Sequence, residues 1–74
     1  MDKKEFTKQL GKRIKECRHK ANITQTELAL RCGKDRQHIE LIENGKTTCT
    51  SYTLYLIVKS LKCSYDELFS FEQD

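Results

Sequence analysis

Cysteine is the first residue type to consider for chemistry in this chain, because its thiolate binds metals and forms disulfides. The four cysteines stand at positions 17, 32, 49 and 63. No two of them have the C-x-x-C spacing of a metal or redox site, and no histidine follows at a zinc-finger distance. Since free cysteine packs as a small hydrophobe, we expect reduced packing residues and no metal. Redox sensing remains an alternative for Cys49, which falls in a predicted loop and could cross-link two chains.

No other group of side chains has the arrangement of an active site. The sequence shows no Ser-His-Asp set, metal cluster or phosphate-binding loop, and a chain of 74 residues has little room for a deep cleft. A domain of this size buries only about 60% of its unfolded surface, so packed helices, a dimer or a bound partner would help it. We expect a single domain over residues 1–74, no enzymatic activity, no cofactor and no small-molecule ligand.

The apolar segments are short. None approaches the roughly 20 residues that cross a bilayer, and the first ten residues, MDKKEFTKQL, do not resemble a secretory signal. We therefore expect a cytoplasmic protein that does not bind membranes, and its unpaired cysteines agree with a reducing compartment.

Charge is divided unevenly along the chain. Residues 1–62 hold all 14 basic residues and seven of the 11 acidic ones, a net charge of +7, whereas residues 63–74 hold the other four acids and no base, a net charge of −4. A basic body indicates a polyanionic partner such as nucleic acid. An ordinary solvated surface with a chance imbalance is the alternative.

The elements that must position these residues are helices. Apolar residues recur at steps of three and four, and no alternating segment is long enough for a strand. Capping boxes begin at Thr24 and Ser64, and helix-stop glycines follow at 33 and 45. We predict an all-α fold with helices over about 3–20, 25–32, 36–43 and 65–70. A further helix, capped by Thr50 or Ser51, carries the apolar stripe from Leu54 to Leu61 and is broken at Lys62-Cys63.

Two of these short helices meet at the Gly33 turn, over about residues 24–44. This order is typical of the helix-turn-helix motif, whose second helix enters the DNA major groove. The groove is about 12 Å wide and therefore admits an α-helix. The sequence thus indicates double-stranded DNA as the partner.

A longer pattern surrounds this motif. It comprises ITQTELA at 23–29, Gly33, Ile39, IENGK at 42–46, and a continuation from Leu54 to Phe69. On these residues the chain resembles the Cro/repressor-type (XRE-type) helix-turn-helix family over roughly residues 8–70. The resemblance implies a five-helix lambda-repressor-like fold and a sequence-specific transcriptional regulator, most often a repressor that binds a palindromic operator as a homodimer. An antitoxin-like or other protein-interaction module with the same fold is the alternative.

The resemblance also implies which residues contact DNA. Arg36 and Gln37 match the first exposed residues of the helix that reads bases, and Leu41 lies one turn further. Arginine forms paired hydrogen bonds with guanine, glutamine with adenine, and leucine packs against a thymine methyl; solvated helix surface is the alternative for each. Contacts with the sugar-phosphate backbone, which position a protein without reading sequence, are expected from Thr24, Gln25, His38, Asn44, Lys46 and Thr47.

Structural roles follow from the same resemblance. Arg18 and Glu43 match a salt bridge between the first and third helices. The expected dimer interface comprises Tyr52, Tyr65, Leu68 and Phe71, with a core position for Leu68 and an ordinary surface position for Tyr65 as alternatives. The chain departs from the family pattern at three places: Lys34 replaces an apolar residue, Cys49 a frequent proline and Lys62 a helix-ending glycine.

Overall fold

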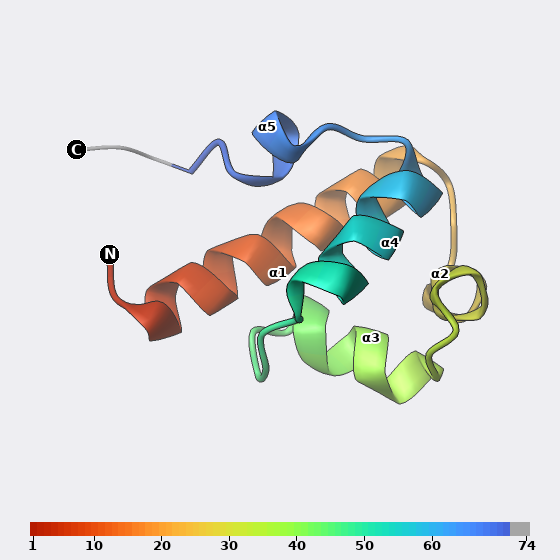
Figure 1. Ribbon diagram of the computed structural model, residues 1–74, viewed down its shortest axis with the longest axis horizontal. Helices are drawn as coiled ribbons and strands as arrows, with labels where there is room; N and C mark the ends of the chain where they lie inside the picture. Colours follow the sequence, from red (N-terminus) through yellow and green to blue (C-terminus); the bar gives the residue numbers. More distant parts are fainter. Residues whose placement is uncertain (72–74) are drawn as a thin grey trace.

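The computed structural model describes residues 1–71, which form five α-helices and no strand within that range. They are α1 (Lys3–Lys20), α2 (Gln25–Cys32), α3 (Arg36–Glu43), α4 (Ser51–Leu61) and α5 (Tyr65–Leu68). The predicted all-α class with five helices is confirmed (Figure 1). Two residues of the predicted acidic tail, Glu72 and Asp74, lie outside the described residues.

The long helix α1 organises the packing. It contacts α3, α4 and α5, while α2 packs against α3 and α4. In Figure 1, α3 and α5 lie on opposite sides of α1, and α2 lies next to the beginning of α3. The largest side chains that are completely buried come from all five helices: Ile14, Leu28, Ile39, Ile42, Ile57 and Leu68. No described helix is long and apolar enough to cross a membrane.

Each helix begins at a capping side chain. Asp2, Thr24, Asp35, Thr50 and Ser64 each accept a hydrogen bond from the backbone N–H three residues further on. The capping box at Ser64 is complete, because Glu67 bonds back to the Ser64 N–H at 2.9 Å. The box at Thr24 forms only in one direction, since the Glu27 carboxylate accepts instead from Arg31 at 3.0 Å.

Four of the residues that follow the helices adopt a left-handed backbone conformation. Positive φ angles occur at Asn22, Gly33, Gly45 and Lys62. After α3, the N–H of Gly45 bonds to the carbonyl of Ile42 and that of Lys46 to the carbonyl of Leu41, which is the Schellman arrangement. This turn sends the chain away from α3 sharply, toward α1.

Gly11, in the middle of α1, marks a close approach of α1 to the end of α3. A Cβ atom at this position would overlap the carbonyl oxygen of Ile42 and lie 2.9 Å from that of Glu43. The backbone of α1 therefore lies directly against the end of α3. Glycine is a poor helix former, and its position here is explained by packing.

The structure corrects several expectations at the end of the chain. The last helix ends at Leu68, two residues earlier than predicted, and Phe69 is its C-cap. Leu68 is completely buried and Phe71 is 9% exposed, so both belong to the interior of the protomer and not to the surface that was expected to form a dimer. The Phe71 ring lies 5.7 Å from the Phe6 ring and 5.9 Å from the Phe69 ring.

The cysteines are free thiols. Cys32 is buried, and the other three are half-buried and packed against the core. Cys49 is therefore less accessible than its loop position suggested, which weakens the cross-linking hypothesis.

Candidate nucleic-acid interface

The interface is built on α2, the Gly33 turn and α3. Gly33 adopts a left-handed conformation with φ of 66°, which ends α2 and reverses the chain within a few residues. Asp35 then caps α3 by accepting from the His38 N–H at 2.9 Å. On its inner side α3 buries Ile39 and Ile42 against the core. The opposite side of the same two turns is left for solvent or a ligand.

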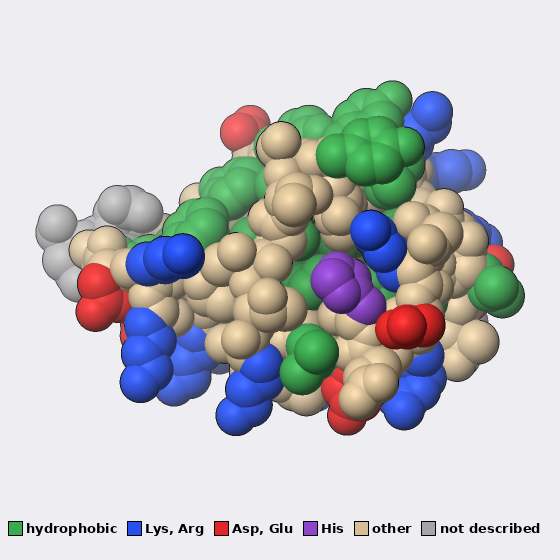
Figure 2. All heavy atoms as spheres, turned by 60° about the horizontal axis from the view of Figure 1, so that its bottom comes forward, with side chains coloured by type: hydrophobic (Ala, Val, Ile, Leu, Met, Phe, Trp, Pro, Cys, Tyr) green, Lys and Arg blue, Asp and Glu red, His purple; other side chains and the backbone are tan. Residues whose placement is uncertain are grey.

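The exposed side of α3 carries Arg36, Gln37 and Leu41, the three residues that were expected to contact bases. Leu41 is 41% exposed, so its apolar side chain is available on this side of the helix. Figure 2 views the molecule from this side and shows lysine and arginine side chains at both ends and along the lower edge. The face therefore combines base-compatible side chains with a cationic border.

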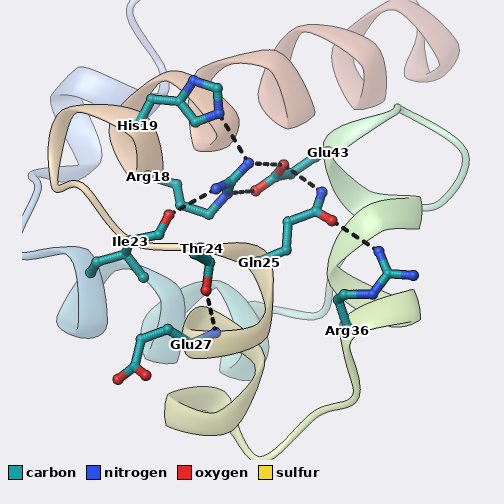
Figure 3. Close-up of polar contacts among 8 residues, drawn as sticks. All are labelled: Arg18, His19, Ile23, Thr24, Gln25, Glu27, Arg36 and Glu43. Carbon is teal, nitrogen blue, oxygen red and sulfur yellow. Dashed lines mark hydrogen bonds and ion pairs between the residues drawn. The ribbon is translucent and has the colours of Figure 1, made fainter.

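A buried ion pair sets the position of α3 relative to α1. Arg18 donates to Glu43 through Nε at 2.7 Å and through Nη2 at 3.1 Å. The side chains are 9% and 0% exposed, so the predicted salt bridge is confirmed. Arg18 also donates from Nη1 to the Ile23 carbonyl at 2.8 Å, and its Nη2 lies 3.2 Å from Nε2 of His19 (Figure 3). One guanidinium thus joins α1, the turn before α2, and the end of α3.

Gln25 continues this network to the exposed side of α3. Its Nε2 donates to Oε1 of Glu43 at 3.0 Å, and its Oε1 accepts from Nη1 of Arg36 at 3.2 Å (Figure 3). The same Arg36 nitrogen donates to Glu40 at 3.3 Å. Both ends of the Gln25 amide are therefore engaged within the protein, a role that the sequence interpretation as a phosphate contact did not include.

Glu40 is the residue of this face that sequence reasoning missed. It lies one turn after Arg36, and the two side chains form an ion pair with 53% of Arg36 and 44% of Glu40 exposed. The signal was available in the sequence, because an arginine and a glutamate four residues apart on a helix are neighbours. In the absence of DNA, Arg36 is thus held by one neutral and one charged acceptor.

Most of the residues expected to contact the DNA backbone lie at the two ends of the helix-turn-helix, and His38 lies in the first turn of α3. Thr24 accepts from the Glu27 N–H at 3.1 Å, which leaves its own hydroxyl proton available to a phosphate. His38 is half-buried, whereas Asn44 and Lys46 are exposed. The Thr47 hydroxyl donates to the Thr48 carbonyl at 3.3 Å, so a bond to phosphate would require it to rotate.

Several known proteins are similar to this chain in sequence or in fold. The helix-turn-helix family matches residues 14–68. Two uncharacterized HTH-type transcriptional regulators of Archaeoglobus fulgidus are 37% and 34% identical to the chain over 62 residues, which is 84% of this chain and 87% and 89% of theirs. The restriction-modification controller protein C.AhdI from Aeromonas hydrophila superimposes with a TM-score of 0.86 at 25% identity, covering 93% of this chain and 100% of that one.

These similarities agree with the geometry of α2 and α3, in which a capped helix presents one exposed side next to a cationic border. The chain therefore belongs to the XRE-type helix-turn-helix family, and it is a DNA-binding transcriptional regulator.

Proposed function

We propose that this regulator recognises a palindromic operator as a homodimer and represses transcription from it. The observation that carries the proposal is the support of α3: Arg18, Glu43 and Gln25 hold the helix and its first arginine from behind. A rigid support favours sequence-specific reading, because side chains that are already ordered lose less entropy on binding. Repression requires no additional surface, since a protein bound across a promoter excludes the polymerase.

In this proposal α3 lies in the major groove. Arg36 and Gln37 read base edges, and Leu41 contacts a thymine methyl group. The backbone contacts come from Thr24 and Gln25 at the beginning of α2, from His38 in α3, and from Asn44, Lys46 and Thr47 after α3. Each good base contact contributes about 1–3 kcal/mol of discrimination against a wrong base pair.

A homodimer is proposed because one module is small. A single module buries only about 600–1,000 Å² on DNA, and two modules on adjacent half-sites bind far more tightly. The proposed dimer interface is supported by exposed aromatic side chains on α4. Tyr52 and Tyr55 are 67% and 47% exposed, and the centroids of their stacked rings are 6.5 Å apart. Lys59 lies over the Tyr55 ring at 5.7 Å. Tyr65, 45% exposed on α5, stays in the proposed interface, whereas Leu68 and Phe71 leave it.

We further propose that the protein acts in the cytoplasm. The four free cysteines agree with a reducing compartment, and so does a DNA target.

Selection from a random duplex library at about 150 mM salt tests the function. The expected result is an enriched inverted repeat with half-site centres about 10 base pairs or a multiple of this apart. An Arg36→Ala variant should then select a site with relaxed preference at one position of each half-site. Weak, salt-sensitive binding without enrichment would contradict sequence-specific recognition, and a single enriched half-site would contradict the dimer.

A further inference from the structure

A basic groove lies beside the helix-turn-helix, between the first turns of α1 and the loop after α3. Its volume is about 790 Å³. Lys3, Lys4 and Lys8 of α1 form one wall, and the loop from Asn44 to Thr48, with Lys46, forms the other. In Figure 1 this loop lies below α1, between α3 and α4. No carboxylate side chain lines the groove.

The four lysines of the basic groove carry charges that the protein does not neutralise. Within residues 1–71, none of their ammonium groups forms an ion pair with a carboxylate. The nearest acids along the chain have other partners, since Asp2 accepts from the Glu5 N–H at 2.8 Å and Glu5 accepts from the Gln9 amide at 2.8 Å. Four like charges around one hollow attract an anion and repel one another without it.

The two walls are held together through their backbones. Gly45 has φ of 72°, and a Cβ atom at this position would lie 2.9 Å from the Cα of Lys8. The loop therefore rests directly on α1, so the separation of the walls does not depend on flexible side chains. Because the loop begins at the C-cap of α3, the basic groove is continuous with the end of the helix that faces DNA.

We propose that the basic groove holds backbone phosphates of the DNA strand that flanks the bases read by α3. The inference rests on the proposed DNA recognition and extends its footprint to α1. Lysine suits this role, because its ammonium is a flexible point charge that contacts phosphates without the bidentate geometry of arginine. DNA backbone is the appropriate polyanion, since the loop wall already belongs to the proposed interface and a duplex seated on α3 carries phosphates past its end.

The test compares two double variants with the same change in charge. K4Q/K8Q removes two lysines of the basic groove, and K20Q/K62Q removes two that line a separate pocket near α5. Binding to the duplex selected by the wild type is measured across a salt series. Each lost phosphate contact reduces the slope of log K against log salt by about 0.9, so K4Q/K8Q should reduce it by about 2 per bound protomer.

The control variant K20Q/K62Q should leave the slope close to that of the wild type, and K4R/K8R should retain it because both charges are kept. Preference between the selected duplex and single-base variants should not change in K4Q/K8Q, since phosphates carry no sequence information. Thermal unfolding followed by circular dichroism checks that all variants are folded.

Equal slopes for K4Q/K8Q and K20Q/K62Q would overturn the proposal. A wild type without any preferred duplex would contradict the proposed function instead, and the same salt series on random-sequence DNA would then still test the groove. The two failures are therefore distinguishable.

Discussion

Gln25 and Arg36 are joined side chain to side chain, with the Arg36 Nη1 donating to the Gln25 Oε1 at 3.2 Å. The other end of the Gln25 amide donates to the buried carboxylate of Glu43, which is paired with Arg18. Arg36, at the start of α3, is thus connected through Gln25 to the buried Arg18–Glu43 pair that joins α1 and α3. The direction of its guanidinium is set before DNA arrives.

This connection predicts that Gln25 affects which base pair is preferred. Replacing Gln25 with alanine leaves Arg36 with Glu40 as its protein acceptor, so its guanidinium samples more orientations. We expect Q25A to lose part of the roughly 1–3 kcal/mol that separates the correct base pair from the others at the position read by Arg36. Competition binding with duplexes altered at that position measures the loss.

Lys46→Ala is the matched control for this experiment. Because Lys46 is exposed and is proposed to contact phosphate, its removal should weaken the selected site and random DNA to a similar degree. If Q25A weakens all duplexes equally and leaves the preference at that base pair unchanged, Gln25 acts only through phosphate and does not position Arg36.

The buried ion pair predicts a large effect on stability when one partner is removed. Arg18→Ala leaves the Glu43 carboxylate, which is 0% exposed, without its bidentate partner. We expect a loss of about 3–5 kcal/mol in the free energy of unfolding, measured by urea denaturation.

The double variant R18M/E43L should recover much of this loss, because an apolar pair avoids an unpaired buried charge. A loss below about 1 kcal/mol for R18A would be typical of an exposed pair and would contradict the assigned burial.

Replacing Gly33 or Gly45 with alanine should lower the stability of the protein by different amounts. Both have positive φ, so alanine at either position introduces strain of about 1–2 kcal/mol. At Gly33 a Cβ meets nothing within 4 Å, whereas at Gly45 it meets the backbone of Lys8 at 2.9 Å. We expect G45A to be the more destabilising variant in thermal unfolding. Equal losses would indicate that the loop separates easily from α1.

The exposed tyrosines of α4 predict the oligomeric state. Replacing Tyr52 and Tyr55 with lysine places charge in the proposed interface, so sedimentation should show monomers where the wild type is a dimer. Leu30→Lys is the control, because Leu30 is 72% exposed on α2, outside the proposed interface. A dimer that persists in Y52K/Y55K would exclude this surface.

The raised pKa of the Cys63 thiol leads us to expect a lower free energy of unfolding in alkaline solution. Burial, followed by the neighbouring Cys17, raises the pKa of the Cys63 thiol from its ordinary value of 9.0 to about 11. Below pH 9 the thiol is protonated in both states, and its contribution to stability is fully present. Between pH 9 and about 11 the unfolded chain loses this proton first, so the free energy of unfolding should fall as pH rises.

Denaturation across this pH range measures the effect, and Cys63→Ser should reduce the slope. Since a protonated thiol is a poor nucleophile, Cys63 should also react slowly with a thiol reagent near pH 8 in the folded protein. Rapid reaction would contradict the raised pKa.

The sequence by itself determined the local structure. The bounds predicted for α1, α2 and α3 agree with the observed ones, because capping residues such as Thr24 and Asp35 and stop residues such as Gly33 act within one turn. The apolar spacing predicted most of the buried face of each helix, and the motif pattern predicted the Arg18–Glu43 pair. The choice of bases remains a prediction, since no local rule derives an operator from a helix surface.

Tertiary structure alone decided how distant residues meet. Gly11 lies in α1 because the backbone of α3 occupies the space of its side chain, and Gln25 points inward because Glu43 and Arg36 provide partners on both sides of its amide. Leu68 and Phe71 became core residues because α5 and the residues up to Phe71 pack against α1. The basic groove likewise unites lysines about forty positions apart. Such contacts depend on the relative placement of whole helices, which is set by the packing of the complete core and not by any short stretch of residues.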